Sequence, residues 1–454
     1  MSRGAIAYVD LCALKNNFSR IKTVASGCSI LAMIKSNAYG HGLSRVATAL
    51  SEADAFGVAS LEEAVILRTA GIQQSIMVMA GFYSEEELPQ FVHYDLTAIV
   101  HRSDQVSILE KKTIKKPLSV WLKIDTGMHR LGFSIKEALA MYARLQACTF
   151  VRQPMVILTH LADADNPKRQ FTETQIANFN HITAHLSNPK SIVNSAGLLS
   201  YRDALADWVR PGIVLYGVSP FLDRVGEQEG LQPVMTLTAK IIAKKQVKKG
   251  DCVGYGCTWV CPEDMPMGIV GIGYGDGYPR HAKNGTPTLV NGKRCPLVGR
   301  VSMDMIAIDL RECSMAAVGD RVVLWGKGLP VEKIAECADT IGYELLCHVT
   351  SRVEFIEKSV LPEMQYSDAK KKLSHEVRSS ELNRIRWHCT RRGMLELDTL
   401  LGNFFDHHFL QLSDHEQQLF VALLEQPDPV LYDWLLGHSD PDDAEVLALI
   451  KKIR

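Results

Sequence analysis

The sequence predicts an α/β protein with three folded parts: a (β/α)8 TIM barrel, a mainly β domain and a small all-α domain. Between residues 29 and 216, eight short apolar runs alternate with amphipathic segments, which is typical of a closed barrel. After Pro233, strand-like segments follow one another closely, and beyond residue 380 the pattern is helical. An open, doubly wound sheet is the alternative to the barrel, because hydrophobic periodicity does not distinguish a closed sheet from an open one.

The barrel strands are expected at short runs rich in Val and Ile. In chain order these runs are SILAMIK, AFGVAS, SIMVMAG, LTAIVHR, LSVWLKI, PMVILTH, KSIVNS and DWVR. The segments between them have one apolar face, as in LEEAVILRTAG, SEEELPQFVHY, SIKEALAMYARLQA and FTETQIANFNHITAHL. Each run and the helix after it can form one unit of a parallel sheet.

The second part of the chain has a different pattern. Its strand-like segments are MTLTAKIIAKKQV, MGIVGIGYG, TPTLVNGKRCPLVGRVS, MIAIDL and DRVVLWG. Because glycine-rich turns separate them and few helices intervene, they predict a mainly β domain of about 120 residues.

The last part is predicted to be a helical domain after a polar linker. LSDHEQQLFVALLEQ begins with a capping box formed by Ser413 and Glu416. PDPVLYDWLLG has prolines at its start and Gly437 at its end, as helices commonly do. The predicted domains are 1–225 for the barrel, 226–360 for the β domain, 361–380 for the linker and 381–454 for the helical domain.

Composition limits the function classes. The formal net charge of −1 over 454 residues does not suggest general nucleic-acid binding. No apolar run approaches the ~18 residues of a membrane span, and the first residues lack the apolar core of a signal peptide. The eleven cysteines are scattered, and the closest pair, Cys257 and Cys261, fits no common zinc or redox motif. We therefore expect a cytoplasmic protein with reduced thiols and no metal site.

Polar residues follow several of the predicted barrel strands. Lys35 ends the first run, His160 the sixth, Ser195 the seventh and Arg210 the eighth. The catalytic residues of such barrels lie at the carboxyl ends of the strands, and phosphate sites often lie after strands seven and eight. A lysine amine opposite a phosphate site suits pyridoxal 5'-phosphate, an aldehyde cofactor that carries a phosphate.

Eight motifs then show a resemblance to a known family. AMIKSNAYGHG, LKIDTGMHRLG, THLADAD, NSAG, RPGIVLYG, GIGYGDGYPR, GRVSMD and GYELL occur in the order seen in alanine racemases, over residues 5 to about 360. The resemblance implies a pyridoxal-phosphate enzyme that interconverts L-alanine and D-alanine and so supplies D-alanine for peptidoglycan. It also implies a head-to-tail homodimer with shared active sites.

The same resemblance implies roles for individual residues. Lys35 would carry the cofactor as a Schiff base and act as one base, while Tyr274, from the partner subunit, would be the second base. The phosphate would be held by Tyr39, Ser195, Gly212, Ile213 and Tyr343. Arg210 would face the pyridine nitrogen and leave it unprotonated, because arginine does not give up a proton. His160 and Arg210 would support the phenolate of Tyr274.

Three more positions match residues that contact substrate or support these contacts. Arg130 would bind the cofactor's phenolic oxygen and the substrate carboxylate, and Met303 would add a backbone N–H from the partner subunit. Lys123 matches a lysine that is carbamylated in some family members, where it supports the arginine that corresponds to Arg130. A plain ion pair between Lys123 and a nearby carboxylate is the alternative.

The helical domain resembles a different family, the small assembly factor that helps attach FAD to the flavoprotein subunit of succinate dehydrogenase. The resemblance is placed on residues 381–440. It implies that the Arg392, Gly393 and Glu396 stretch engages the flavoprotein, and an ordinary helix with an Arg–Glu pair is the alternative. The other matching residues are Asp428, Pro429, Asp433, Trp434 and Gly437.

Three other functions stay open at this point. The chain could be a racemase of another or of broad amino-acid specificity, since pocket shape separates these enzymes. It could be a non-enzymatic pyridoxal phosphate carrier, although the β domain with Tyr274 argues against this. It could act mainly as a flavoprotein assembly factor, although the intact set of Lys35, Tyr274, Arg130 and Arg210 argues against an inactive racemase part.

Overall fold

The computed structural model describes residues 4–358, except 112–115, 167 and 169, and residues 389 and 394–454, except 410–411, 425, 427 and 442. The chain forms two compact units, Met1–Leu361 and Pro362–Arg454, and each is described by itself. Within the described residues, no helix has the length and apolar character needed to cross a bilayer.

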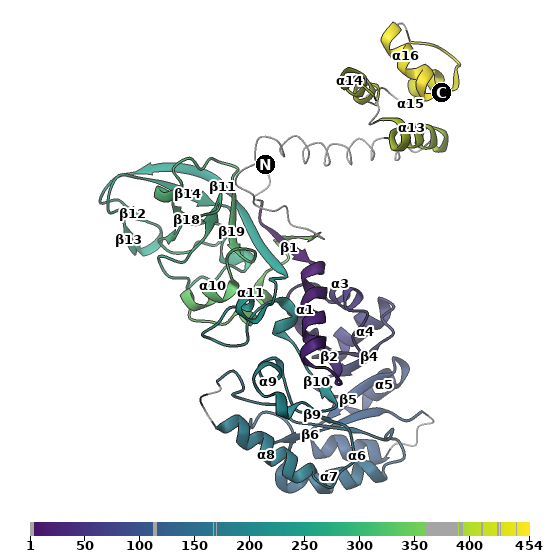
Figure 1. Ribbon diagram of the computed structural model, residues 1–454, viewed down its shortest axis with the longest axis vertical. Helices are drawn as coiled ribbons and strands as arrows, with labels where there is room; N and C mark the ends of the chain where they lie inside the picture. Colours follow the sequence, from purple (N-terminus) through teal and green to yellow (C-terminus); the bar gives the residue numbers. More distant parts are fainter. Residues whose placement is uncertain are drawn as a thin grey trace. The chain divides into compact units, whose positions relative to one another are not determined.

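The first unit begins with a strand of the second sheet and then enters a closed barrel (Figure 1). The barrel strands are β2 (Ser29–Met33), β3 (Ala55–Val58), β4 (Ser75–Val78), β5 (Leu96–Val100), β6 (Ser119–Asp125), β8 (Val156–Leu158), β9 (Lys190–Ser191) and β10 (Trp208–Val209). Neighbouring strands are parallel, and pairing of β5 with β6 and of β10 with β2 closes the ring. The prediction of a (β/α)8 barrel is confirmed, and the open sheet is excluded.

The helices lie on the outside of the barrel, and their own residues explain their limits. They are α1 (Leu11–Val24), α3 (Leu43–Ala49), α4 (Leu61–Thr69), α5 (Leu88–His93), α6 (Ser103–Lys111), α7 (Ile135–Ala147), α8 (Phe171–Thr183) and α9 (Ser195–Ser200). Asp10 caps α1 by accepting a hydrogen bond from the backbone N–H of Ala13 at 2.8 Å. Strands covered on both faces are mostly apolar, and every residue of β3 and of β5 is buried.

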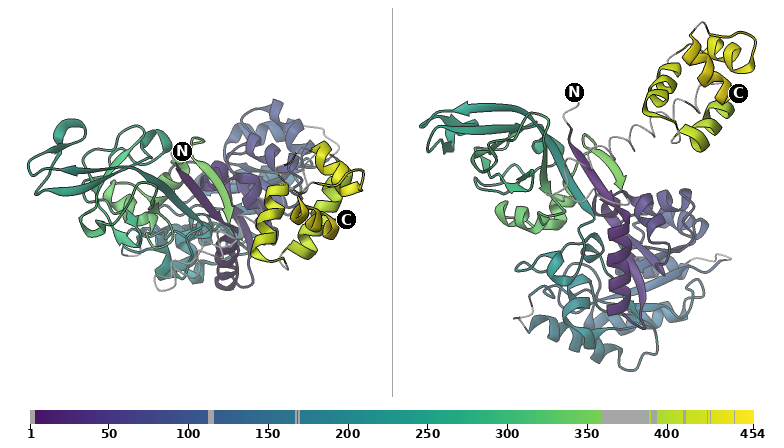
Figure 2. Two further views of the ribbon diagram at one scale, coloured as in Figure 1. Left: turned by 90° about the horizontal axis from the view of Figure 1, so that it is seen from above. Right: turned by 45° about the horizontal axis from the view of Figure 1, so that its top comes forward.

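The second sheet is mainly antiparallel and forms most of the β domain (Figure 2). Its strands are β1 (Ile6–Asp10), β11 (Met235–Val247), β14 (Met265–Val270), β15 (Leu289–Val290), β16 (Lys293–Arg294), β17 (Leu297–Val298), β18 (Ile306–Asp309), β19 (Arg321–Trp325) and β20 (Glu354–Lys358). The prediction of a mainly β second part is confirmed. The chain's first strand, β1, also belongs here: it pairs with β11 and β20, although it precedes the barrel in sequence.

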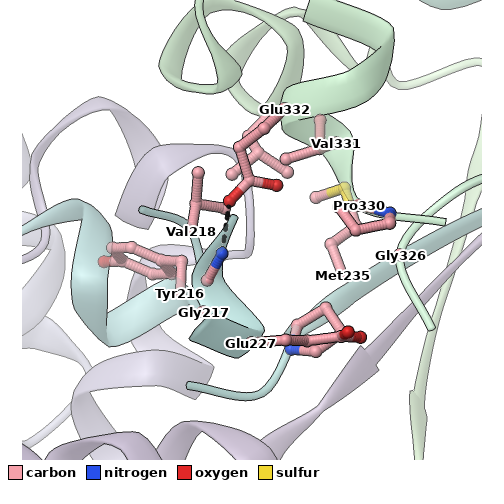
Figure 3. A pocket seen from close by; sticks show the side chains of 12 residues that line it. Tyr216, Gly217, Val218, Glu227, Met235, Gly326, Pro330, Val331 and Glu332 are labelled. Atoms are coloured by element: carbon pink, nitrogen blue, oxygen red, sulfur yellow. Dashed lines mark hydrogen bonds between the residues drawn. The ribbon is translucent and has the colours of Figure 1, made fainter. Parts of the chain in front are cut away.

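The β domain also carries two helices, α10 (Val331–Cys337) and α11 (Gly342–His348), and α10 is part of a buried joint with the barrel. In this joint, Oε1 of Glu332 accepts hydrogen bonds from the backbone N–H groups of Ser219 and Gly226, both at 2.8 Å. Figure 3 shows Glu332 beside Val218 and Val331. Burial raises the pKa of Glu332. The void beside it measures only about 10 Å³, roughly one water molecule, so it is a joint and not a ligand site.

The second unit contains α13 (Leu395–His408), α14 (Asp414–Leu423), α15 (Asp428–Leu436) and α16 (Ala444–Ile453). The capping box predicted for α14 is present, since the side chains of Ser413 and Glu416 each accept a hydrogen bond from the other's backbone N–H. Gly437 follows α15 with φ +80°, as expected for a glycine that ends a helix.

This unit has a core of its own. Phe404 and Leu423 are buried in it, and Leu400, Leu419 and Trp434 pack against it. Helix α16 adds Leu449, Ile450 and Ile453 to the same core. The core therefore continues past residue 440, the end of the segment on which the resemblance rests, and agrees with the predicted domain of residues 381–454.

Candidate active site

Lys35 lies just beyond β2, at the start of a short segment, α2 (Lys35–Tyr39), that winds in the left-handed sense. The four residues after Lys35 have φ values between 52° and 55°. Such a conformation costs about 1–2 kcal/mol for each non-glycine residue, so the surroundings must hold it in place. Glu63 contributes, because its Oε1 accepts a hydrogen bond from the Asn37 backbone N–H at 3.1 Å. The strained turn brings the side chains of Lys35 and Tyr39 to one cavity.

This cavity of about 710 Å³ lies at the mouth of the barrel. Its lining includes ten of the residues chosen from the sequence: Lys35, Tyr39, Lys123, Arg130, His160, Ser195, Arg210, Gly212, Ile213 and Tyr343. Tyr343 comes from α11, so the β domain contributes to the cavity as well. The two remaining residues, Tyr274 and Met303, do not line it and are exposed to 39% and 52%.

One side of the cavity gathers hydroxyl groups and backbone N–H groups. The backbone N–H of Gly212 donates to Ser195 Oγ at 2.8 Å, and a Cβ added to Gly212 would lie 2.5 Å from the Tyr39 hydroxyl oxygen. The Tyr39 ring stacks on Tyr216, with centroids 4.8 Å apart, and lies 6.0 Å from the Tyr343 ring. Burial raises the pKa of Tyr39 and of Tyr343, so both phenols stay protonated and can donate hydrogen bonds. This donor set suits a phosphate group.

The other side of the cavity is rich in positive charge. Burial, followed by repulsion from Arg130, lowers the pKa of Lys35. Burial and the charges of Arg130 and Arg210 lower the pKa of Lys123 to about 8. Burial lowers the pKa of Arg210 to about 10, which leaves its guanidinium charged at neutral pH. Positive charges that raise one another's energy in this way favour the binding of an anionic ligand between them.

Arg210 is held rigidly by acceptors around it. It donates to Ser191 Oγ at 2.5 Å and to the carbonyl oxygens of Thr159 and Ile192 at 2.6 and 3.1 Å. Its Nη2 also lies 3.5 Å from Nδ1 of His160. Burial and the charge of Arg210 lower the pKa of His160 well below its usual value, so this imidazole is neutral at neutral pH.

Three residues around the cavity were missed from the sequence. Glu63 supports the left-handed turn, Tyr216 supports the Tyr39 ring, and Cys347 lines the cavity one helical turn after Tyr343. The spacing of four residues in GYELLC indicates that Cys347 and Tyr343 share a helix face, so the motif did carry this signal. Tyr216 lies within the motif RPGIVLYG, although no role was assigned to it. No motif marks Glu63, which acts through a contact between distant segments.

In the second unit the predicted partner-binding stretch is only partly described. Arg392 and Gly393 lie outside the described residues, and Glu396 is placed in α13 by its backbone alone. The other matching residues lie in α15 or directly after it, and they are Asp428, Pro429, Asp433, Trp434 and Gly437.

The closed barrel holds a lysine amine and a set of hydrogen-bond donors suited to a phosphate in one cavity, and an antiparallel domain follows it. This combination is typical of a class of pyridoxal-phosphate enzymes. The chain belongs to the alanine racemase family. The model of the alanine racemase N-terminal domain matches residues 9–220, and that of the C-terminal domain matches residues 234–357. The family depends on pyridoxal 5'-phosphate, and its members are dimeric.

Individual relatives agree with this assignment. The chain is 59% identical to an alanine racemase from Coxiella burnetii over 358 residues, which is 78% of this chain and 98% of the relative. It is 47% identical to an alanine racemase from Shewanella woodyi, over 76% of this chain and 97% of the relative. The biosynthetic alanine racemase from Pseudomonas aeruginosa superposes with a TM-score of 0.76 at 41% identity, covering 78% of this chain and 99% of that one.

The second unit matches a separate family. The model described as "Flavinator of succinate dehydrogenase" covers residues 383–454, which includes α16. The resemblance inferred from the sequence is confirmed, and it extends to Arg454.

Proposed function

We propose that the first unit interconverts L-alanine and D-alanine by a two-base mechanism with pyridoxal 5'-phosphate. The observation that carries this proposal is the single cavity in which the Lys35 amine faces the hydroxyl and N–H groups of Tyr39, Ser195, Gly212 and Tyr343. The β domain carries Tyr274, which lies outside this cavity and would supply the second base to the site of the partner subunit.

The residues of the cavity fit the cofactor. Tyr39, Tyr343, Ser195 and the backbone N–H groups at Gly212 and Ile213 would hold its phosphate. Arg210 would face the ring nitrogen and would leave it unprotonated, since a guanidinium cannot supply a proton at neutral pH. When bound, the cofactor acidifies the Cα–H of an amino acid by withdrawing electrons from it.

Racemisation needs a base on each face of Cα. The Lys35 amine takes or returns the proton on one face, and its lowered pKa makes the neutral amine more available. The phenol of Tyr274, from the partner subunit, serves the other face. Neutral His160, whose Nδ1 is occupied by Arg210, has its Nε2–H free to donate to the Tyr274 oxygen and to stabilise a phenolate there.

Two groups orient the substrate carboxylate. Arg130 lines the cavity and adds a positive charge to it, so a carboxylate is attracted to this side. The backbone N–H of Met303, brought in by the partner, completes the contact. Exposure of both Tyr274 and Met303 in the single chain supports a homodimer in which each β domain completes the other subunit's site.

The direct test follows the conversion of L-alanine by circular dichroism with the pure, cofactor-loaded protein. Loss of the L-alanine signal until both enantiomers are equal is expected. Serine and lysine are assayed in parallel, because a faster conversion of either would assign the site to another amino acid. A stable cofactor spectrum without conversion of any amino acid would instead favour a carrier.

The cytoplasmic location expected from the sequence stays a prediction.

Lys123 is expected to react with carbon dioxide. A carbamate forms only from a neutral amine, and with a pKa of about 8 roughly a tenth of Lys123 is neutral at pH 7, far more than for an ordinary lysine. The resulting anion would neutralise the charge around it and brace Arg130. With labelled bicarbonate, a carbamate carbon signal should appear in the NMR spectrum and should increase between pH 7 and pH 8.

The Lys123→Arg variant is the control for this prediction, and it should lack the signal while it keeps the charge. A wild-type spectrum without a carbamate signal would favour the alternative, in which the Lys123 ammonium pairs with a carboxylate such as that of Asp125.

We also propose that the second unit promotes covalent attachment of FAD to the flavoprotein subunit of succinate dehydrogenase. Its separate core and the match of the flavinator family over residues 383–454 support this proposal. Arg392, Gly393 and Glu396 would form the contact surface, with Gly393 permitting close approach.

A segment of residues 381–454 is expected to fold alone as a helical unit and to raise the covalent FAD content of that flavoprotein. A segment that ends at residue 440 should be less stable, because it lacks the core side chains of α16. Arg392→Ala and Glu396→Ala should reduce flavinylation, whereas Lys451→Ala, on an exposed position of α16, should not. The rest of the chain without this unit should keep its racemase activity, and loss of activity with dimer and cofactor intact would contradict the separation of the two functions.

A further inference from the structure

The loop that carries Tyr274 is joined to the loop that carries Met303 through their backbones. The N–H of Tyr274 donates to the carbonyl oxygen of Ser302 at 3.0 Å, and the N–H of Gly275 donates to that of Met303 at 2.9 Å. Any shift of one loop therefore displaces the other.

The glycines beside Tyr274 make this contact possible. A Cβ on Gly273 would lie 2.2 Å from the carbonyl oxygen of Ser302, and a Cβ on Gly275 would lie 2.3 Å from Nη1 of Arg352. Gly273 has φ −151°, an ordinary extended value, so space rather than backbone conformation requires a glycine here. The Arg352 guanidinium thus packs directly against the backbone of the Tyr274 loop.

Arg352 also bridges the two loops with its charge. Its Nε lies 3.3 Å from Oδ1 of Asp276, on the Tyr274 loop, and its Nη2 contacts the carboxylate of Asp304, directly after Met303. Asp276 is completely buried, and its Oδ2 accepts a hydrogen bond from the N–H of Gly273 at 2.9 Å. One guanidinium therefore fixes a buried carboxylate on the first loop and a half-exposed one on the second.

The segment before Arg352 adds two more contacts to the Tyr274 loop. Thr350 donates from Oγ1 to the carbonyl oxygen of Gly275 at 3.1 Å and from its backbone N–H to that of Asp276, also at 3.1 Å. The Tyr274 side chain is 39% exposed, and these polar contacts hold the base of the loop that carries its phenol.

We propose that Arg352 is a positioning residue for the second base: it clamps the Tyr274 and Met303 loops together, so that phenol and N–H reach the partner's cavity in one fixed arrangement. This inference rests on the proposed racemase function. A base must stand within hydrogen-bond reach of the proton that it takes, and a displacement of about 1 Å can cost roughly 100-fold in rate.

The test replaces Arg352 with glutamine and with lysine in the cofactor-loaded dimer. Solvent deuterium uptake at Cα is measured separately from L-alanine and from D-alanine. Uptake from the enantiomer that Tyr274 deprotonates is expected to fall roughly 100-fold in Arg352→Gln, and uptake from the enantiomer that Lys35 deprotonates much less. KM should also rise, because the Met303 N–H moves with the loop. Arg352→Lys keeps the positive charge but cannot contact both carboxylates with a planar guanidinium, so an intermediate loss of deuterium uptake is expected.

Arg311 provides a matched control in the same domain. It also bridges two carboxylates, with Nη2 2.7 Å from Asp309 Oδ2 and a contact to Glu263, and its side chain is 39% exposed against 41% for Arg352. Arg311→Gln removes an equivalent bridge away from the Tyr274 loop, so the ratio of the two uptake rates should stay as in the wild type.

Two results would overturn the inference. The first is that Arg352→Gln and Arg352→Lys lose deuterium uptake equally from both enantiomers and also lose the dimer or the cofactor. This result would show that Arg352 has only a structural role. The other is an unchanged ratio in folded Arg352→Gln dimer. Wild-type uptake in the same assay separates these results from failure of the proposed function, which would show as no uptake at all.

Discussion

Lys35→Ala is expected to reduce racemisation by roughly 1,000-fold or more, because it removes both the covalent attachment of the cofactor and one of the two bases. The rest of the cavity should still bind the cofactor, since its phosphate donors and Arg210 are unchanged. The variant should therefore keep some cofactor, with a spectrum of the free aldehyde, and lack activity. Measuring bound cofactor and conversion on one sample tests this expectation.

Borohydride reduction and peptide mapping locate the attachment point directly. Lys123 is the competing residue, because its amine lines the same cavity and has a pKa of about 8. In wild type the label is expected on Lys35 alone, and in Lys35→Ala no lysine should be labelled. A label on Lys123 in the wild type would contradict the assignment of Lys35.

Tyr274→Phe is expected to reduce proton abstraction from one enantiomer by roughly 100-fold to 10,000-fold, while Lys35 still serves its own face. Cα deuterium uptake from L-alanine and D-alanine, measured separately, tests this. An equal loss from both enantiomers would count against separate bases.

Mixed dimers test whether Tyr274 acts on the partner's site. In a dimer of one Lys35→Ala chain and one Tyr274→Phe chain, one site receives an intact Lys35 and an intact Tyr274 from different subunits. Random mixing of two inactive variants should therefore restore about one quarter of wild-type activity. If Tyr274 acted within its own chain, mixing would restore nothing. Mixing Lys35→Ala with itself is the matched control.

Much of the fold could be read from local patterns. Apolar runs marked the barrel strands because these strands are covered on both faces, and the capping box at Ser413 marked the start of α14 because capping involves only neighbouring residues. The cavity residues were found by ordered motifs and by their position at strand ends. Ser195 deviates slightly, since it begins α9 four residues after β9 and does not end the strand itself.

Other features depend on contacts between distant segments, which leave no period in the sequence. Closure of the barrel depends on β5 meeting β6 and β10 meeting β2. The membership of β1 in the second sheet depends on pairing with β11 and β20, and nothing in its residues distinguishes a barrel strand from a strand of that sheet. The packing of α16 into the helical core depends on such contacts as well.

The sequence by itself thus determined the order of strands and helices, the helix ends and the chemical groups of the site, because these depend on residue type and on neighbours within a few positions. Only the tertiary structure decided which groups share a cavity and what holds them there. Glu63, from another helix, helps to hold the left-handed turn after Lys35 by accepting a hydrogen bond from the backbone N–H of Asn37. Arg352 meets the Tyr274 loop from a segment far along the chain. Long-range packing sets both arrangements, and residue periodicity contains no record of it.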